Sequence, residues 1–459
     1  MSPQSISLES TNKVMSCHSG LFLVDELWER LNLKNRLRRL LPKKKRERGT
    51  RQINKVKSIL FSFAAGNDCL SDLDDLLEDD LFLSLTGGGT HSRTAGDFLF
   101  GFHKRQIEKI QNVLLETTFL LRLAMYEEKK FILSMDSPPH KQCGKKMEKL
   151  GLNYKGIWGF DSQNAYDQFG FSYLFDLRPG NTWSGTEAER WIHEIFSKCP
   201  DWMERYFRAD SGYGEYAVYA ALKAASVKYA IVLKENIGKY VRKKNKDHLV
   251  WAKTEVEFFN SDKCELAMGL YPLEDLGNLR VVFIRKKKSE AEINSQLDLL
   301  KAYNPEEDDY QYYSIITNID SSEMTGEEVI EFYRGRANCE NFIKEQKHNF
   351  DFLHFPCKKF EANQVWGLIG TFAHNMTRFL SFCMPQKVKR VRGKDDVVRT
   401  VTQLGYFAKK VRSTIINLPC QVVRSARRIK LKLNPNHKEV LEKLMTNIQR
   451  MFRKDTVPI

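Results

Sequence analysis

The sequence has few features that would cross-link a small fold or anchor it in a membrane. Its nine cysteines form no C-x-x-C pair and no Cys/His cluster at zinc-ligand spacing, which argues against a zinc finger or a disulfide scaffold. Residues 1–20 lack a basic stretch followed by an apolar one, so we expect no secretory signal. No window reaches the roughly 18 consecutive apolar residues of a membrane span. These absences predict a cytoplasmic protein with reduced thiols.

The sequence also contains fewer acidic than basic residues. Asp and Glu number 58 against 73 Lys and Arg, which gives a formal net charge of +15. This excess favours a polyanionic partner, either nucleic acid or an anionic membrane surface, although a basic protein of another kind would show the same charge. Two basic segments, 34–57 and 387–432, favour nucleic acid. The 459-residue chain is long enough for two or three packed domains.

Helical and strand patterns alternate along the chain. Apolar residues recur at spacings of three and four through much of 1–125, which predicts helices. From residue 131, short β-branched and aromatic runs bounded by Gly, Asn and Pro predict three strands, followed by alternating helices and strands. This order is typical of an α/β fold with a mixed sheet and packed helices. Residues 236–320 again show the pattern of strands, and the chain after them is helical. A β-rich block inside an α/β unit is predicted to be an insertion.

Two carboxylates stand at the ends of predicted strands. Asp136 ends the run FILSMD, and Asp210 ends the run ERYFRAD. Side chains that leave the ends of neighbouring strands can meet at one edge of a sheet, and two convergent carboxylates suit Mg²⁺, which prefers oxygen ligands. An ordinary turn cap is the alternative for either residue, since Asp210-Ser211-Gly212 is good turn chemistry. These two residues by themselves leave both interpretations open.

A further group of polar residues lies on a helix predicted after the insertion. Tyr333, Arg336, Glu340 and Lys347 stand at offsets of 0, 3, 7 and 14. On one continuous helix of about 100° per residue they fall within an arc of about 60°, and Lys344 joins them. An acid among cations and a tyrosine suits a phosphodiester site, in which the acid binds a metal ion and the cations meet phosphates. An exposed helix with i,i+4 ion pairs would show the same pattern.

Geometry on that predicted helix selects Glu340 over two other acids. With Tyr333 at zero, Glu340 falls at about −20°, Glu345 at about 120° and Glu331 at about 160°. The last two acids would point away from the face that carries the cations. Glu340 is therefore predicted to be the third acid of the site.

The acid segments and their order resemble the DDE transposases of bacterial insertion sequences. Tyr333, Arg336, Glu340 and Lys347 match the Y-x2-R-x3-E-x6-K signature of the cut-and-paste group that carries a β-strand insertion before its last acid. RADSGYG resembles the segment around the family's second Asp, and LRPGN resembles the turn that ends its first-Asp segment. HSRTAGDFLFGF and CKKFEANQVWGLIGTFAHNM are similar to other family segments, so the resemblance covers most of the chain.

The resemblance implies a ribonuclease H-like core in which Asp136, Asp210 and Glu340 are the catalytic residues and the metal ligands. It implies two Mg²⁺ ions, for which Mn²⁺ can substitute. The expected activity is DNA transposition, with strand cleavage by water followed by strand transfer from the freed 3′-hydroxyl. No Ser, Tyr or Cys nucleophile is required for this chemistry.

The same resemblance implies double-stranded DNA as the partner, both as transposon ends and as target. It also implies a homodimer in the synaptic complex, in a bacterial cytoplasm where the protein associates with the nucleoid. Trp251 of the insertion is expected to stack on a displaced base, with a role in the insertion's own core as the alternative. The expected DNA contacts are Tyr333, Arg336, Lys344, Lys347 and Trp251.

Five regions are predicted from these patterns and from the resemblance. They are a helical N-terminal DNA-binding region (1–125), the first part of the ribonuclease H-like core (126–235), the β-rich insertion (236–322), the second part of the core with the Glu helix (323–380) and a basic helical C-terminal region (381–459).

One position departs from the family pattern. Pro138 stands two residues after the first Asp, where the family is expected to carry a small hydroxyl residue. This departure keeps open an alternative, a catalytically inactive DNA-binding protein derived from a transposase. A host nuclease of another fold would cut DNA without joining ends, and a glycosidase with paired acids would need no charge of +15.

Overall fold

The chain forms two compact units in the computed structural model. The helical unit comprises Met1–Tyr126, Gly144–Glu148 and Glu345–Ile459, and the sheet unit comprises Glu127–Cys143 and Lys149–Lys344. The structure describes residues 9–44, 48–125, 128–144, 146–153, 155–256, 258, 264–288, 310–392, 398–403, 405–425 and 428–452.

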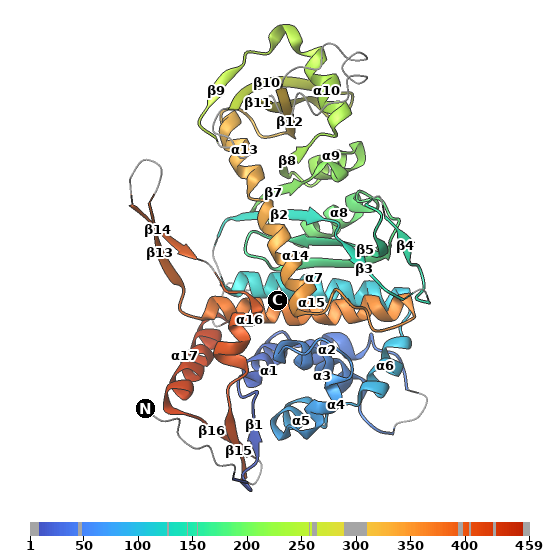
Figure 1. Cartoon of the computed structure of the whole chain (residues 1–459), viewed down its shortest axis with the longest axis vertical. Coiled ribbons are helices and arrows are strands. Elements are labelled where there is room, and N and C mark those ends of the chain that lie inside the picture. Colours follow the sequence, from blue (N-terminus) through green and yellow to red (C-terminus); the bar gives the residue numbers. More distant parts are fainter. Residues whose placement is uncertain are drawn as a thin grey trace, which may run out of the picture. The chain divides into compact units, whose positions relative to one another are not determined.

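A mixed sheet forms the centre of the sheet unit (Figure 1). Its first five long strands are β2 (Lys130–Asp136), β5 (Trp158–Tyr166), β6 (Ser172–Pro179), β7 (Glu204–Ala209) and β8 (Lys228–Val232). β2, β7 and β8 are mutually parallel neighbours, whereas β5 runs antiparallel to both β2 and β6. The mixed sheet with the order β6-β5-β2-β7-β8 is consistent with the expected ribonuclease H-like core.

Continuous apolar runs and helical spacing explain these elements. β5 and β6 are buried along almost their whole length, as expected for strands covered on both faces. α8 (Ala188–Lys198) buries Trp191, Ile192 and Ile195, which recur at helical spacing on one side. α9 (Tyr216–Ala224) follows β7 and leads into β8. The predicted alternation of helices and strands over this part of the chain is confirmed.

The strands of the predicted insertion continue the same sheet. They are β9 (Ala252–Thr254), β10 (Cys264–Leu273), β11 (Gly277–Lys287) and β12 (Tyr310–Thr317). β12 pairs antiparallel with β8, and β11, β10 and β9 follow in that order. α10 (Glu235–Lys244) packs on β10 and β12. The block is therefore β-rich as predicted, and it satisfies the free backbone groups along β8. Residues 289–309 of the block lie outside the described part of the chain.

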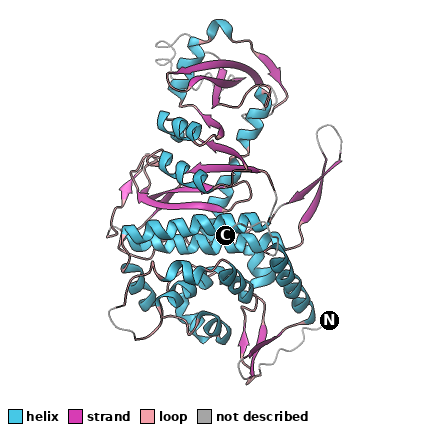
Figure 2. Cartoon of the chain, turned by 180° about the vertical axis from the view of Figure 1, so that it is seen from behind, coloured by secondary structure: helices cyan, strands magenta, loops and turns pink. Residues whose placement is uncertain are grey.

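A long buried helix, α15 (Phe360–Cys383), forms the centre of the helical unit. It packs beside α7 (Lys104–Met125) and α3 (Gln52–Ala65) (Figure 2). Nearly every residue of α15 is buried, as expected for a helix at the centre of a core. The rings of Phe63 and Trp366 lie 4.5 Å apart between α3 and α15. None of the helices in the described ranges combines the length and the apolarity needed to cross a bilayer.

Further elements complete both units. The helical unit also contains β1 (Met15–Ser16), α1 (Leu21–Arg30), α2 (Leu33–Arg38), α4 (Asp72–Asp75), α5 (Asp80–Thr86), α6 (Ser92–Phe100), α16 (Ala408–Val411) and α17 (Pro435–Met451). The sheet unit adds β3 (Pro139–Lys141) and β4 (Gly151–Leu152), both paired with β5.

The C-terminal region 381–459 is only partly helical. It also contains β13 (Lys387–Arg392), β14 (Val398–Gln403), β15 (Cys420–Ser425) and β16 (Arg428–Lys432). RIKLK of β16 alternates cations with apolar residues, and β13, β14 and β15 are rich in valine, so the pattern suits strands better than a helix. β1 pairs with β15, so residues from the two ends of the chain share one small sheet. The side chains of the basic segment 387–404 lie outside the described part.

Candidate active site

Asp136 and Asp210 leave the carboxyl edge of the sheet from two neighbouring strands. Asp136 is the last residue of β2, and Asp210 directly follows β7. In the parallel ladder between these strands Ser134 pairs with Arg208, and each acid lies two residues further along its own strand. Because side chains alternate between the faces of a strand, both carboxylates emerge on the same face. The structure thus brings together the two acids that the sequence placed at strand ends.

Burial and like charge both act on this pair. The Gly212 N–H donates to Oδ1 of Asp210 at 2.9 Å, and the Ser137 N–H donates to Oδ1 of Asp136 at 2.8 Å. Burial raises the pKa of Asp210, and the charge of Asp136 raises it further, whereas Arg336 lowers it. Two carboxylates in one desolvated place need a cation to remain ionised together.

Arg336 is the cation that links the acids. Its Nη1 donates to Oδ2 of Asp136 at 3.2 Å, and its Nη2 lies 3.7 Å from Oε1 of Glu340. Burial alone would lower the pKa of Arg336, but Asp136, Tyr333 and Asp210 together raise it above its ordinary value. The Arg336 side chain is 14% exposed, so most of the guanidinium lies inside the site rather than in solvent.

The helix that carries this residue is not continuous, and the prediction of a single helix is wrong. α13 (Gly326–Arg334) ends and α14 (Ala337–Asn349) begins on either side of Gly335 and Arg336. A side chain at position 335 would come within 2.1 Å of Nη1 of Arg208, so glycine lets the two segments pack closely there. The regular step of about 100° per residue therefore does not connect the residues of α13 with those of α14.

Arg208 holds this junction against the sheet. Its Nε donates to Oγ of Ser134 at 3.2 Å, and its Nη1 donates to the carbonyl of Phe332 at 3.0 Å. The guanidinium also lies 5.3 Å from the centre of the Phe332 ring. Burial lowers the pKa of Arg208 to about 10. Its place two positions before Asp210 is the one signal for this residue in the sequence, and that signal does not indicate its contacts with Ser134 and Phe332.

The two rival acids of this region have other partners. Oε1 of Glu345 accepts a hydrogen bond from the Ala408 N–H at 2.5 Å, and burial raises the pKa of the Glu345 carboxyl. Glu331 is exposed and pairs with Arg334 at 2.6 Å. Glu345 therefore belongs to the core of the helical unit, and Glu331 to an exposed ion pair on α13.

The remaining residues of the predicted signature differ in their surroundings. Tyr333 is 6% exposed, and its hydroxyl lies 3.0 Å from that of Tyr313. Lys344 is exposed on α14, one turn after Glu340. Lys347 lies on the same helix but falls within the helical unit, because the division between the units passes between residues 344 and 345. On α14 itself, the spacing of Glu340, Lys344 and Lys347 still corresponds to one side of the helix.

Trp251 lies within a ladder of aromatic and guanidinium groups in the β-rich block. Its ring centroid is 4.0 Å from Cζ of Arg285 and 5.9 Å from the ring of Tyr312. Arg285 also lies 4.1 Å from the Tyr310 ring, and Arg242 lies 3.6 Å from the Tyr312 ring. The indole of Trp251 is therefore already in contact with side chains of its own block.

A cavity of about 480 Å³ opens between Asp210 and this ladder. Asp210 and Arg336 contribute to one wall, whereas cations and tyrosines form much of the rest. The latter include Lys239, Arg242, Lys288, Tyr310 and Tyr312. Flat rings interleaved with positive charge are typical of surfaces that bind single-stranded nucleic acid.

A buried ion pair supports the end of β2. Arg178 donates through Nε to Oδ1 of Asp161 at 2.9 Å and through Nη2 to Oγ of Ser137 at 2.6 Å. Its Nη1 donates to the carbonyls of Ser184 and Thr186 at 3.3 and 3.2 Å. Burial raises the pKa of Asp161, although Arg178 opposes that effect. The residue after Asp136 is thus connected to the loop that follows β6, a connection that the motif LRPGN did not reveal.

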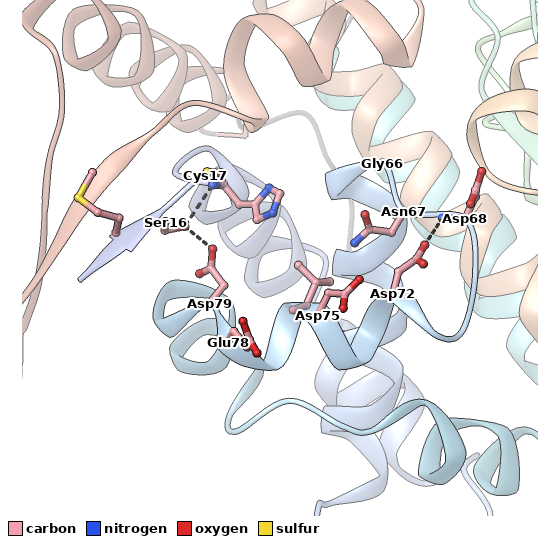
Figure 3. A pocket seen from close by; sticks show the side chains of 12 residues that line it. Ser16, Cys17, Gly66, Asn67, Asp68, Asp72, Asp75, Glu78 and Asp79 are labelled. Atoms are coloured by element: carbon pink, nitrogen blue, oxygen red, sulfur yellow. Dashed lines mark hydrogen bonds between the residues drawn. The ribbon is translucent and has the colours of Figure 1, made fainter. Parts of the chain in front are cut away.

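A separate acidic pocket lies in the helical unit (Figure 3). Among the described residues, only Asp68, Cys69 and Asp72 bring three potential metal-ligand atoms within 4.8 Å of one another. The three predicted catalytic acids are further apart than this. Oδ2 of Asp72 accepts the N–H groups of Asp68 and Cys69 at 3.0 Å each, and the Ser16 hydroxyl donates to Asp79 at 2.7 Å. These carboxylates therefore cap local turns.

A family model matches almost the whole chain. The family described as "Transposase DDE domain group 1" matches residues 1–453. No curated protein sequence matches the chain. Among solved structures, the chain is similar to a piggyBac transposase in a synaptic complex with hairpin DNA, at 11% identity and a TM-score of 0.46, over 97% of this chain and 85% of that one.

Proposed function

Because this chain belongs to the DDE-domain transposases of group 1, we propose that it binds the ends of an insertion sequence and joins them to new DNA by metal-dependent hydrolysis and strand transfer. The observation that carries this proposal is the placement of the acids. Asp136 and Asp210 share one face at the carboxyl edge of neighbouring strands, and Arg336 links Asp136 to Glu340.

The three acids would hold two Mg²⁺ ions, for which Mn²⁺ can substitute. A donor set made only of carboxylate oxygens suits these hard cations. The guanidinium of Arg336 supports the assignment, because it shows that Asp136 and Glu340 can hold a positive charge between them. When bound, the ions supply activation of a water or of a 3′-hydroxyl and stabilisation of the leaving oxygen.

The residues of the chain itself would position the DNA strand. Arg336 precedes Glu340 by four residues and Lys344 follows it by four. Both would contact backbone phosphates, together with Lys347 further along α14. Tyr333 would contribute through its hydroxyl beside Arg336. Holding the scissile phosphate in line with its attacker lowers the barrier by removing translational and rotational freedom before the reaction.

The proposed partner is double-stranded DNA, as transposon ends and as target, bound by a homodimer in the synaptic complex. The net charge of +15 favours such a polyanion. We place the protein in the bacterial cytoplasm at the nucleoid. All nine cysteines are free thiols, which agrees with a reducing compartment.

Pro138 supports a second candidate, a catalytically inactive derivative that keeps DNA binding. The Pro138 carbonyl accepts the Ser162 N–H at 3.3 Å, next to the pairing of β3 with β5. The proline therefore leaves Asp136 at the end of β2 but removes the hydroxyl expected at this position. An intact protein that binds end DNA without nicking it in either Mg²⁺ or Mn²⁺ would support this second candidate.

Cleavage of end DNA by Asp136→Asn and Asp210→Asn proteins tests the proposal. Short inverted repeats, sought on either side of the reading frame in the genome, would supply the substrate. We expect both variants to bind this DNA and to lose Mg²⁺- or Mn²⁺-dependent nicking, whereas Asp201→Asn, at an exposed aspartate before β7, should cut normally. Near wild-type nicking by either site variant would remove that residue from the ligand set.

A further inference from the structure

Trp183 exposes an aromatic ring close to the proposed catalytic edge. It is 49% exposed and lies on the loop between β6 and α8. β6 runs parallel to β2, since both strands are antiparallel to β5. The loop therefore leaves the sheet at the same edge as Asp136 and Asp210.

The indole is held in a defined orientation by the segment that follows Asp210. Its Nε1–H donates to Oε1 of Glu215 at 2.9 Å. Nζ of Lys234 lies 4.9 Å from the ring centroid and 3.4 Å from the same carboxylate oxygen. A cation at this distance from an indole face is attracted to the ring. Two contacts thus orient a side chain that is 49% exposed.

The loop itself is packed against both acid segments. A side chain at Gly185 would come within 3.0 Å of the Gly212 carbonyl, and one at Gly212 would come within 2.9 Å of Cβ of Ser184. Arg178, which bonds the residue after Asp136, donates to the Ser184 carbonyl. Trp183 is therefore preorganised relative to the acids rather than carried on a free loop.

We propose that Trp183 is a stacking surface for an unpaired nucleobase of the DNA strand whose phosphate lies at Asp136 and Asp210. Lys234 neutralises a phosphate next to that base. An exposed, oriented indole and an ammonium group are the two components that bind single-stranded DNA without sequence preference. This inference rests on the proposed function, because it takes the scissile strand to lie at the carboxyl edge.

Trp158 is also exposed, at 42%, and begins β5 six residues before Asn164, the strand partner of Asp136. Two further exposed or partly exposed tryptophans, Trp251 and Trp202, differ from Trp183 in their surroundings. The ring of Trp251 is in contact with Arg285 and Tyr312 of its own block. Trp202 is 53% exposed but precedes β7, so it lies at the opposite edge of the sheet from Asp210. Trp202 therefore serves as a matched control of equal chemistry and similar exposure.

Binding of a labelled oligothymidylate to the full chain in EDTA tests this inference without any cleavage. We expect Trp183→Ala to weaken binding by about fivefold or more, the range found for removal of one base–aromatic stack. Trp183→Phe keeps a stacking ring and should stay within about threefold of the wild type, and Trp202→Ala should not change the affinity. Quenching of tryptophan fluorescence by the oligonucleotide should be smaller in Trp183→Phe than in Trp202→Phe.

The outcomes separate this inference from the proposed function. If the wild type binds and Trp183→Ala binds as tightly as Trp202→Ala, the stacking role is wrong and the transposase proposal is unaffected. If the wild type shows no salt-sensitive binding to DNA, the proposed function fails and this inference fails with it. Circular dichroism of Trp183→Ala, and retention of binding by Trp183→Phe, distinguish the absence of a stacking ring from a misfolded loop.

Discussion

Replacing Arg336 by Met should destabilise the metal-free protein and make its stability depend on Mg²⁺. The guanidinium lies 3.2 Å from Oδ2 of Asp136 and 3.7 Å from Oε1 of Glu340. Burial, and after it the like charge of Asp136, already raises the pKa of Asp210. Methionine keeps much of the side-chain volume but removes the charge. The carboxylates would then face one another without a cation.

The size of the effect follows from burial. Removing one partner of a fully buried ion pair costs about 3–5 kcal/mol, whereas an exposed pair contributes about 0–1 kcal/mol. The side chains of Arg336 and Asp136 are 14% and 18% exposed, so we expect a loss of about 2–3 kcal/mol in the free energy of unfolding. A bound Mg²⁺ ion supplies the missing positive charge, and an ion at a hundred times its dissociation constant stabilises the native state by about 2.7 kcal/mol.

Urea unfolding with and without Mg²⁺ measures both quantities. Arg334→Met is the matched control, since Arg334 lies two residues away in an ion pair whose side chains are 43% and 55% exposed. We expect Arg336→Met to have a much lower free energy of unfolding than the wild type in EDTA. Adding Mg²⁺ should raise the free energy of unfolding of Arg336→Met by more than that of the wild type. Both effects should be small for Arg334→Met. Equal midpoints for the two variants in EDTA, or an equal Mg²⁺ effect in Arg336→Met and the wild type, would refute the reasoning.

Three further predictions concern other parts of the molecule. Glu340→Gln should abolish nicking of end DNA in Mg²⁺ while Glu331→Gln stays active, and an active Glu340→Gln protein would rule out the proposed triad. Burial raises the pKa of Asp351 to about 7. The folded state therefore binds the Asp351 proton more tightly than the unfolded state does, and the free energy of unfolding should fall as pH rises from about 4 to about 7. Asp351→Asn should remove that slope and be more stable than the wild type at pH 8 by on the order of 2 kcal/mol, measured by urea unfolding. In the basic segment 34–57, Arg38→Ala and Arg39→Ala should weaken the salt dependence of DNA binding. The slope of log affinity against log salt concentration should decrease in magnitude by about 0.9 for each phosphate that the protein no longer neutralises. An unchanged slope would show that neither arginine contacts DNA.

The helix break at Gly335 shows where periodicity fails as a guide. The spacing of Tyr333, Arg336 and Glu340 assumed a constant rotation per residue, yet α13 and α14 are separate helices. Arg336 nevertheless contacts both Asp136 and Glu340. Arg208 packs into the junction between α13 and α14, where Gly335 has no side chain to block it. Contacts with a distant strand decide this local conformation, and no window of sequence around the helix contains them.

The chain's own sequence determined the strand-end acids, the order of helices and strands around them and the match to a transposase family. These features follow from local patterns of apolar residues and turn residues, which are encoded over a few positions. Pairing of β12 with β8, which makes the β-rich block part of the main sheet, was decided only by the tertiary structure. So were the cation between Asp136 and Glu340 and the exposed orientation of Trp183. Each of these depends on groups tens to hundreds of residues apart in sequence, whose proximity arises only when the sheet and its covering segments assemble.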